Sequence, residues 1–371
     1  MRSRKVLLVA GARPNFMKIA PIIRALTVWN GENPDGKVEQ VLVHTGQHYD
    51  PEMSEIFFQD LEIPAPAHFL GVGSGSHAVQ TARVMVAFEE VCSQEGPDAV
   101  VVVGDVNSTL ACALTAKKMG IRVAHVEAGL RSRDLTMPEE INRMLTDAVS
   151  DWLFASEPAG VENLRAEGRP AEAIHLVGNT MVDSLLLALA RQGAGKPEEG
   201  PAGGEGHYAV LTLHRPSNVD DPEKLRGILS AVEAIGRDLP VFFPVHPRTR
   251  RALEAAGLWD RAQRPGLRGL PPLGYSEFLR LLKGASLVLT DSGGIQEETT
   301  VLGIPCFTIR ENTERPITVA EGTNTLVGTT PAGILAAYGE FRAGKSKRGR
   351  IPPLWDGRAA ERIVGILARE V

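Results

Sequence analysis

The stretch His125-Val-Glu-Ala-Gly-Leu-Arg-Ser-Arg-Asp-Leu-Thr-Met-Pro-Glu-Glu-Ile-Asn-Arg143 predicts a strand end, a loop and a helix in succession. The apolar run Ile121–Val126 indicates a buried strand, and Glu127 follows it directly. A glycine-containing loop then leads to a helix that carries Glu139 and Arg143. Because parallel α/β proteins build active sites at the carboxyl ends of their strands, these carboxylates and arginines suggest acid/base chemistry on an anionic substrate.

A structural interpretation of the same helix remains open. Thr136-Met-Pro-Glu139 has the spacing of a capping box, and Glu139 with Arg143 has the i,i+4 spacing of a surface ion pair. Neither alternative accounts for Glu127, because its apolar approach strand predicts burial near the sheet.

Composition limits the class of protein. The chain has 371 residues, enough for two domains, and 43% apolar residues to form a core in each. Its net charge of −5 provides no bulk attraction to nucleic acid or to an acidic membrane. No apolar stretch approaches the roughly 20 residues that span a bilayer, and the three cysteines match no metal or redox spacing. We therefore expect a cytoplasmic protein that binds neither nucleic acid nor membrane and holds no metal.

Continuous apolar runs recur along the chain with helical segments between them, which is typical of a parallel sheet covered on both faces. The expected strands of a first domain are Val6–Ala10, Gln40–Val43, Ala99–Val103, Val123–Val126, Trp152–Ala155 and Ile174–Val177. Those of a second domain are Ala209–Leu213, Val241–Val245, Leu287–Thr290 and Cys306–Ile309. A stretch rich in Gly, Pro and Glu at 192–206 separates the two series. The pattern predicts two doubly wound, Rossmann-like α/β domains that face a cleft.

The strongest local pattern in the second half is Thr290-Asp-Ser-Gly-Gly-Ile-Gln-Glu-Glu298, where an apolar strand ends in a small-residue turn and a helix begins. The backbone N–H groups of Gly293 and Gly294 and the Ser292 hydroxyl would suit a diphosphate. Glu298 lies deeper in the predicted helix, where it could take a ribose diol. The alternative is an ordinary Ser/Gly helix start in which acidic residues favour the helix dipole.

Other charged side chains also follow predicted strands. Arg13 and Lys18 lie where the first strand leads into a helix, so they form a candidate anion site. Asp105 follows a very apolar strand, and His214 and Arg215 follow another. Clustered carboxylates in such a place raise one another's pKa and can act as acid and base. The side chains expected to face one cleft are Asp105, Glu127, His214 and Ser292.

Seven motifs occur in a fixed order across most of the chain. They are Arg13-Pro14…Lys18, Gly104-Asp105, His125-Val-Glu127-Ala-Gly-Leu-Arg131, Pro138-Glu-Glu-x-Asn-Arg143, His214-Arg215, Thr290-Asp-Ser-Gly-Gly-Ile-Gln-Glu-Glu298 and Thr313-Glu-Arg315-Pro316. Together they resemble the non-hydrolysing UDP-N-acetylglucosamine 2-epimerase family. The resemblance implies a glycosyltransferase-B-type fold, with an N-terminal domain at 1–185, a UDP-binding domain at 207–354 and a last helix at 355–371 that crosses back.

The resemblance also implies a reaction. The family inverts C2 of a UDP-sugar by eliminating UDP and adding it back, without a metal or another cofactor. Asp105, Glu127 and Glu139 would be the catalytic carboxylates, and His214 would assist them. The residues expected at the substrate are Arg13, Lys18, Arg131, Arg143, Arg215, Phe278, Ser292, Gly293, Gly294, Glu298 and Arg315. We expect UDP-N-acetylglucosamine (UDP-GlcNAc) and UDP-N-acetylmannosamine (UDP-ManNAc) as substrate and product, and a homodimer.

Three alternatives remain open. The stretches 45–58 and 135–138 look more like family members that act on UDP-2,3-diacetamido-2,3-dideoxy-glucuronic acid, whose C6 carboxylate Arg131, Arg133 or Arg143 could bind. A retaining UDP-sugar glycosyltransferase would share the fold and the diphosphate turn but would need an acceptor. A catalytically silent sensor of nucleotide sugars would keep the turn but would have no need of the three carboxylates.

Overall fold

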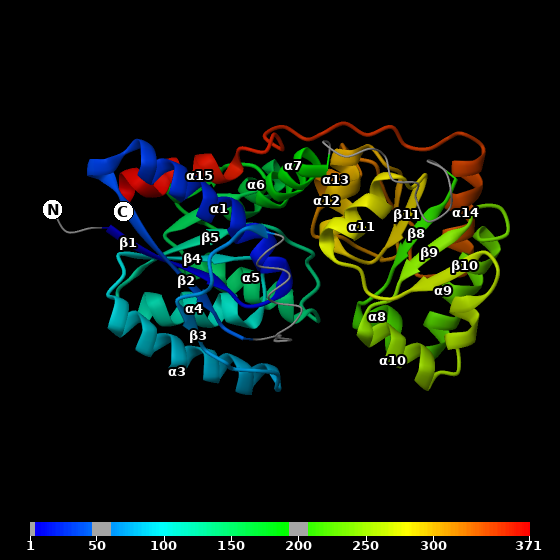
Figure 1. The fold of residues 1–371 in the computed structure, drawn as a ribbon, viewed down its shortest axis with the longest axis horizontal. Helices are drawn as coiled ribbons and strands as arrows, with labels where there is room; N and C mark the ends of the chain where they lie inside the picture. The colour runs from blue at the N-terminus through cyan, green and yellow to red at the C-terminus, as the bar shows by residue number, and fades with distance from the viewer. Residues whose placement is uncertain (1–3, 47–60, 193–206) are drawn as a thin grey trace. The chain divides into compact units, whose positions relative to one another are not determined.

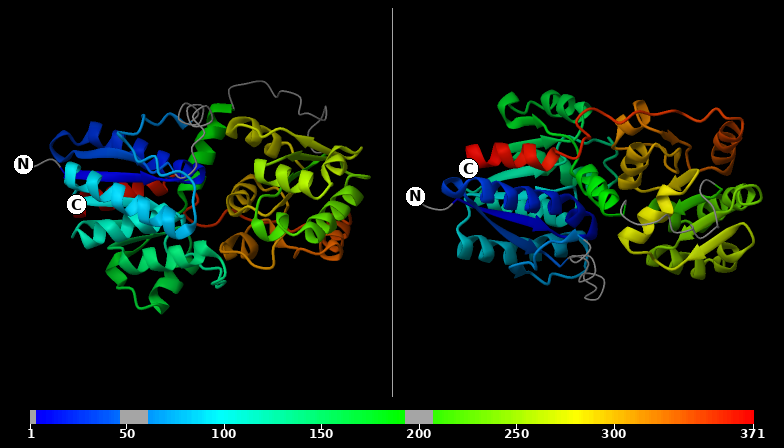
Figure 2. Two further views of the ribbon diagram at one scale, coloured as in Figure 1. Left: turned by 90° about the horizontal axis from the view of Figure 1, so that it is seen from below. Right: turned by 45° about the horizontal axis from the view of Figure 1, so that its top comes forward.

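The computed structural model describes residues 4–46, 61–192 and 207–371, and the chain divides into two compact units (Figure 1, Figure 2). Unit 1 comprises Met1–Leu187 and Pro353–Val371, and unit 2 comprises Ala188–Pro352. Two segments with a predicted role lie outside the described residues. They are most of the stretch 45–58, which resembles the diacetamido-glucuronate epimerases, and the Gly/Pro/Glu-rich segment from residue 193, which separates the two series of strands.

Unit 1 is built on a parallel sheet with seven strands in its described part, in the order β3-β2-β1-β4-β5-β6-β7. The strands are β1 (Arg4–Ala10), β2 (Val38–His44), β3 (His68–Phe69), β4 (Ala99–Val103), β5 (Arg122–Val126), β6 (Trp152–Ala155) and β7 (Ile174–Leu176). The chain winds from β1 outward to β3 and then from β4 to β7, which is the doubly wound topology. The central strand β4 is buried over its whole length, as its unbroken apolar sequence predicts.

Helices cover both faces of this sheet. Against one face pack α3 (His77–Glu95), α4 (Asn107–Lys118) and α5 (Pro138–Val149), and α3 and α4 share an apolar core with β1, β2 and β4. Against the other face lie α1 (Arg13–Glu32) and α15 (Ala359–Glu370), side by side (Figure 1). The other α-helices that the structure describes before residue 193 are α6 (Pro158–Ala166) and α7 (Thr180–Gln192).

The last helix, α15, is bound to unit 1 at both of its ends. The Asp183 carboxylate accepts hydrogen bonds from the backbone N–H groups of Ala359 and Ala360, at 3.2 and 2.8 Å. Because these N–H groups have no partner within their own helix, Asp183 satisfies donors that the fold would otherwise leave open. At the other end, Trp152 donates a hydrogen bond from Nε1 to the Glu370 carboxylate at 2.6 Å.

Unit 2 repeats the same winding with a smaller parallel sheet, whose described strands run in the order β10-β9-β8-β11-β12-β13. They are β8 (Ala209–Thr212), β9 (Val241–Pro244), β10 (Leu267–Leu270), β11 (Leu287–Thr290), β12 (Cys306–Thr308) and β13 (Asn324–Leu326). The helices are α8 (Pro216–Val219), α9 (Pro222–Ile235), α10 (Pro247–Ala255), α11 (Tyr275–Lys283), α12 (Gly293–Leu302), α13 (Pro316–Ala320) and α14 (Pro331–Arg342). The prediction of two doubly wound α/β domains is confirmed.

All ten predicted strands are present, and the three further strands in the described ranges, β3, β10 and β13, are edge strands that were not predicted. Edge strands need less apolar sequence because one side of each pairs with no neighbour. The three cysteines are buried and free. Among the described residues, no helix combines the length and the apolar character needed to cross a membrane.

Candidate active site

Glu127 is the first residue after β5, and its backbone has a φ of 69°, a conformation that favours glycine. Its side chain is buried and forms an ion pair with Nζ of Lys18, from the second turn of α1. Gly104, which follows β4 with a φ of 68°, lies beside this pair, since a Cβ there would stand 3.0 Å from Lys18 Nζ. A non-glycine residue with a positive φ, such as Glu127, is strained, and such residues are found mostly at functional sites. The conformation of Glu127 brings its carboxylate close to Gly104, at the end of the neighbouring strand β4.

Asp105 follows Gly104 at the end of β4, and α5 holds it in place. The Arg143 guanidinium is almost completely buried and forms ion pairs with the carboxylates of Asp105 and Glu140. Asn142 donates a hydrogen bond from Nδ2 to the Asp105 carbonyl oxygen at 3.0 Å. The Asp105 side chain keeps 29% of its surface exposed, so its carboxylate can still meet a ligand.

The two adjacent glutamates at the start of α5 have different surroundings. Glu140 is buried, and its carboxylate accepts the backbone N–H groups of Ser132 and Arg133, both at 2.9 Å. Burial alone would raise the pKa of Glu140, but these hydrogen bonds and the Arg143 charge outweigh it and lower that pKa. Glu139 is half-buried, and its side chain makes no hydrogen bond or ion pair within the described part of the chain. Glu140 therefore fixes the loop, and Glu139 has the carboxylate that a ligand can engage.

Both structural interpretations of this helix are wrong. The N-cap residue of α5 is Met137, and it makes no side-chain cap, so Thr136 and Glu139 form no capping box. Arg143 pairs with Glu140, three residues earlier. In the region that the structure describes, it forms no ion pair with Glu139.

Arg131, expected at the substrate, is enclosed by protein carboxylates instead. Its side chain is buried and forms ion pairs with Asp147 at 2.7 Å and with Glu167 at 2.6 Å. By contrast, Arg133 is exposed and donates a hydrogen bond to the Asn163 amide oxygen at 2.9 Å. This placement favours a role for Arg131 in fixing the loop after β5 over contact with a ligand.

In unit 2, the segments that follow β8 and β11 meet at a buried carboxylate. Asp291 accepts hydrogen bonds from the backbone N–H groups of His214 at 3.1 Å and Arg215 at 3.0 Å. One carboxylate oxygen also lies 2.9 Å from Nδ1 of His214. Burial alone would raise the pKa of Asp291, but its contacts with His214 and with both N–H groups outweigh burial and lower that pKa. Asp291 orients the half-exposed imidazole through Nδ1, which leaves Nε2 for another partner.

The turn that begins at Ser292 joins β11 to α12. Ser292 is the N-cap residue of α12, and its side chain caps no backbone group. Its backbone N–H donates a hydrogen bond to Oγ1 of Thr290 at 2.9 Å. A Cβ on Gly293 would lie 2.7 Å from side-chain atoms of both Arg315 and Glu314, so a larger residue here would displace the ion pair that these two form. The start of α12 therefore offers a hydroxyl and helix N-terminal N–H groups, the donors that bind an anion.

Glu298, in the second turn of α12, is a buried carboxyl group next to a tyrosine. The Tyr275 hydroxyl lies 3.2 Å from its Oε1. Burial raises the pKa of Glu298 to about 7, with a further increase from the Glu297 charge and a decrease from the Tyr275 hydrogen bond. Phe278 follows Tyr275 on α11 and packs, half-buried, against the apolar core beneath that helix. Glu298 can therefore change its protonation state near neutral pH.

A group of buried ion pairs lies beside the start of α12. Arg315 pairs with Glu297 at 2.6 Å and with Glu314 at 2.7 Å. Glu314 also pairs with Arg310 at 2.7 Å and with Arg215 at 3.3 Å. Burial alone would raise the pKa of Glu314, but the three arginines hold it well below its usual value. These ion pairs place three guanidinium groups beside the start of α12, and guanidinium groups are the usual partners of phosphate oxygens.

The structure therefore gathers the predicted residues into one cluster per unit. The unit 1 cluster consists of Lys18, Asp105, Glu127 and Arg143, and Glu139 lies about one helical turn before Arg143 on α5. The unit 2 cluster consists of His214, Arg215, Ser292, Gly293, Gly294, Glu298 and Arg315, with Phe278 on the adjacent helix. The side chain of Arg13 lies outside what the structure describes. Sequence reasoning missed Glu140, Asn142 and Asp291, whose only signal was their position inside the quoted motifs.

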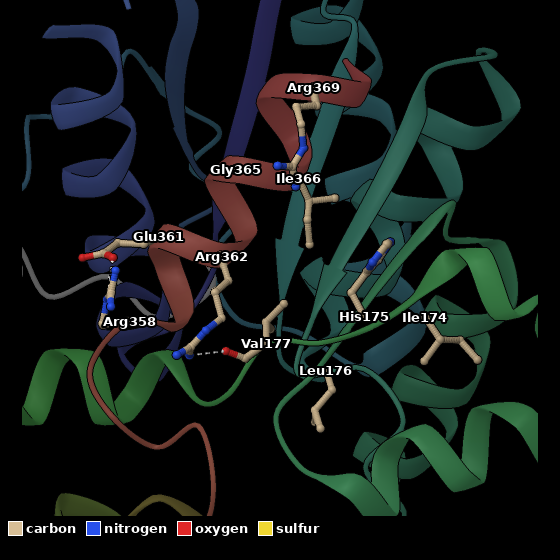
Figure 3. Close-up of a pocket in the computed structure, with 10 residues that line it drawn as sticks. All are labelled: Ile174, His175, Leu176, Val177, Arg358, Glu361, Arg362, Gly365, Ile366 and Arg369. Atoms are coloured by element: carbon tan, nitrogen blue, oxygen red, sulfur yellow. Dashed lines mark hydrogen bonds and ion pairs between the residues drawn. The ribbon is translucent and has the colours of Figure 1, made fainter. Parts of the chain in front are cut away.

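A groove of about 740 Å³ lies within unit 1 between β7 and α15 (Figure 3). None of the predicted site residues lines it. Two of its arginines are already engaged, since Arg358 pairs with Glu361 at 2.8 Å and Arg362 donates to the Val177 carbonyl at 3.0 Å. The groove is therefore not a candidate for the predicted site. Within the described ranges, no group of three or more His, Cys, Asp or Glu side chains could hold a metal ion.

Comparisons with known proteins agree with one another. A family model for UDP-N-acetylglucosamine 2-epimerase matches residues 32–368. A UDP-N-acetylglucosamine 2-epimerase of Methanocaldococcus jannaschii is 44% identical over 371 residues, which cover 98% of each chain. A UDP-2,3-diacetamido-2,3-dideoxy-D-glucuronate 2-epimerase of Pseudomonas aeruginosa is 41% identical over 368 residues, which cover 98% of this chain and 99% of the relative. A crystal structure of M. jannaschii UDP-GlcNAc 2-epimerase in complex with UDP-GlcNAc and UDP superimposes with a TM-score of 0.89 at 42% identity, and covers 98% of this chain and 99% of that one.

Proposed function

Because the chain belongs to the UDP-N-acetylglucosamine 2-epimerase family and is an isomerase, we propose that it interconverts UDP-GlcNAc and UDP-ManNAc. A base removes the proton from C2 while the C1–O bond to UDP breaks, which leaves a C1–C2 double bond in the sugar. A proton then returns to the opposite face of C2, and UDP adds back to C1. The sugar regains every group that it loses, so the reaction needs no co-substrate.

We assign the proton transfers to Asp105, Glu127 and Glu139. No carbonyl acidifies the C2 proton, so its removal must be coupled to the departure of UDP, with a general base held near C2. One observation supports this assignment above the others, namely that two carboxylates at neighbouring strand ends each pair with a cation. Asp105 pairs with Arg143, and Glu127 pairs with Lys18.

We assign UDP to the cluster of unit 2. Ser292, Gly293 and Gly294 at the start of α12 would bind the diphosphate, and the guanidinium groups of the neighbouring arginines would stabilise it as it leaves C1. Glu298 would accept the ribose hydroxyls. The remaining assignments are Phe278 beside uracil, His214 at the sugar or a phosphate, and Arg13 at the phosphates.

Incubation with UDP-GlcNAc alone in D₂O, followed by NMR, tests the proposal. We expect UDP-ManNAc to form and deuterium to enter C2 of both sugars. A retaining glycosyltransferase or a sensor would leave UDP-GlcNAc unchanged without an acceptor. The variant Asp105→Asn, purified in parallel, measures any contaminating epimerase.

A second candidate substrate is UDP-2,3-diacetamido-2,3-dideoxy-glucuronic acid, because the P. aeruginosa relative named for this sugar is nearly as similar to the chain. Its C6 carboxylate would need a cation. Arg131 and Arg143 are each held by two protein carboxylates, whereas Arg133 is exposed and bonded to a neutral amide. Arg133 would therefore be the residue to bind that carboxylate.

Competition between the two sugars in one assay distinguishes these substrates. We expect the larger specificity constant for UDP-GlcNAc. A specificity constant about a hundredfold larger for the diacetamido-uronate would show that this sugar is the substrate. In that case Arg133→Gln should reduce the ratio of the two specificity constants at least tenfold.

We further propose that the enzyme is a homodimer. Apolar side chains are exposed on α5 and α3, which flank α4 on one face of the unit 1 sheet. An exposed apolar patch of this kind marks a protein interface, and a two-fold axis would cover it with the same patch of a second copy. The residues of this apolar patch are Val79, Val86, Ile141, Met144 and Leu145.

We propose the cytoplasm as the location of the enzyme. Its three cysteines are buried and free. Free thiols persist in a reducing compartment, whereas oxidising compartments favour disulfides.

A further inference from the structure

His125 lies in the middle of unit 1, on β5, with none of its surface exposed. Its ring bridges two other elements. Nδ1 lies 2.6 Å from a carboxylate oxygen of Asp147 on α5, and Nε2 lies 2.8 Å from the carbonyl oxygen of Gly104 at the end of β4. A neutral imidazole has one N–H donor and one acceptor nitrogen, so the nature of the two partners decides its protonation.

Both partners of the ring accept hydrogen bonds. The Gly104 carbonyl oxygen can only accept, so Nε2 must carry a hydrogen. The other oxygen of Asp147 accepts the backbone N–H of Gly129 at 3.1 Å and lies 2.7 Å from the Arg131 guanidinium. A carboxylate surrounded by donors in this way is ionised, so Nδ1 must carry a hydrogen too. Consistently, burial alone would raise the pKa of Asp147, but His125 and Arg131 outweigh it and lower that pKa.

We propose that His125 is a buried imidazolium that, together with Asp147, acts as a positioning pair for the acid/base residues. The proposal rests on the proposed function, in which Asp105 and Glu127 act on the sugar. Through Nε2 the ring holds the residue before Asp105. Glu127 follows His125 by two positions, and Asp147 holds Gly129 just beyond it. One charged pair therefore fixes the relative positions of two strand ends and α5.

The charges around the pair balance only if the ring is protonated. Asp147 on α5 contacts the ring, and Arg131 in the loop after β5 contacts Asp147. Glu167, directly after α6, pairs with Arg131. With protonated His125, this group has two cations and two anions. Lys18 and Glu127, which lie beside the Cα of Gly104, form an ion pair and neutralise each other. With a neutral ring, Arg131 alone would balance the buried Asp147 and the partly exposed Glu167.

The protonation state can be measured on the substrate-free wild-type protein. Long-range ¹H–¹⁵N NMR of protein labelled with ¹⁵N-histidine, with His125→Gln for assignment, distinguishes an imidazolium from either neutral tautomer. We expect both nitrogens of His125 to be protonated at pH 7.5. A neutral ring at that pH would overturn the inference, whatever the enzyme's substrate is.

The positioning role is tested with Asp147→Asn. Asp151→Asn is the matched control, because Asp151 accepts the backbone N–H of Val123 at 2.8 Å at the opposite end of β5 and pairs with Lys117. We expect Asp147→Asn to lower kcat at least tenfold, with KM for UDP-GlcNAc and Kd for UDP within about twofold of wild type. Asp151→Asn should lower the melting temperature and leave kcat unchanged.

Equal losses of kcat in the two variants would reduce Asp147 to a structural residue and refute the positioning role. An unchanged kcat in Asp147→Asn would refute it as well. Should the wild-type protein fail to epimerise UDP-GlcNAc, the proposed function falls, and the NMR measurement still decides the protonation of His125.

Discussion

Lys18 and Glu127 form an ion pair in which the two side chains keep only 8% and 4% of their surface exposed. Removing one charge from such a pair leaves the other buried without compensation, which typically destabilises a protein by about 3 kcal/mol or more. The pair therefore couples the proposed chemistry of Glu127 to the stability of unit 1.

We expect Glu127→Gln to lower turnover at least about a hundredfold, the scale of a lost general acid or base, and to lower the melting temperature as well. The double variant Lys18→Met/Glu127→Gln removes both charges, so it should regain stability and remain inactive. Turnover by NMR and thermal melting separate the two effects. A folded Glu127→Gln protein with a wild-type rate would exclude Glu127 from the mechanism.

Asp105→Asn should also lower turnover at least about a hundredfold, but with a smaller loss of stability. Its partner Arg143 would still form an ion pair with the Glu140 carboxylate, and the Asp105 side chain is itself partly exposed. The control is Asp98→Asn, because Asp98 accepts the backbone N–H of Lys5 at 2.8 Å, at the amino ends of the strands and far from the site. Similar rates in the two variants would argue against Asp105 as an acid/base residue.

Elimination should leave a chemical trace. If UDP leaves before C2 is reprotonated, prolonged incubation should release free UDP and the unsaturated sugar 2-acetamidoglucal, which NMR detects. Solvent deuterium should enter C2 in every turnover. Complete epimerisation without deuterium at C2 would require a different chemistry.

The binding of UDP-GlcNAc should depend on the protonation of Glu298. Above its pKa of about 7, Glu298 is a carboxylate that can accept both ribose hydroxyls, and below it the neutral acid loses part of that capacity. Affinity should therefore fall about tenfold between pH 8 and pH 6 if only the ionised form binds. Calorimetry on wild type and Glu298→Gln isolates the effect, because the variant should show a flatter profile. Parallel profiles would assign the pH dependence to another group.

Charge introduced into the apolar patch should separate the dimer. Leu145 on α5 and Val28 on α1 are both exposed apolar residues of unit 1, at 48% and 59%, but only Leu145 belongs to the patch. We expect Leu145→Glu to sediment as a monomer and Val28→Glu to sediment like wild type. A monomeric wild-type protein, or a dimeric Leu145→Glu, would remove the patch as the interface.

The centre of each sheet could be predicted from sequence, whereas its edges could not. Ala99–Val103 and Leu287–Thr290 were predicted residue for residue, because a strand covered on both faces must be apolar throughout. β10, with the sequence Leu267-Arg-Gly-Leu270, shows no such run because it pairs on one side only. Short edge strands are defined by their neighbours more than by their own residues.

The candidate site was predictable to the level of strand ends, and no further. Asp105 and Glu127 stand where their apolar strands end. The sequence did not distinguish the roles of Arg131 and Arg143, because both are arginines of the stretch 125–143 that also carries the carboxylates. Arg143 is the one that pairs with Asp105, and this contact joins residues 38 positions apart, so it depends on where the fold places α5 relative to the end of β4.

The return of α15 to unit 1 affects how the protein folds during its synthesis. On the ribosome, residues 1–187 emerge before unit 2, and α15 emerges after unit 2. At ordinary elongation rates the intervening segment takes roughly ten to thirty seconds to make. Throughout that time the apolar side chains that α15 will cover are exposed, and Asp183 lacks its two backbone donors. Unit 2, one continuous segment, can finish folding first, so a nascent chain that stalls there presents unit 1 to chaperones with the part of its sheet beside α1 still uncovered.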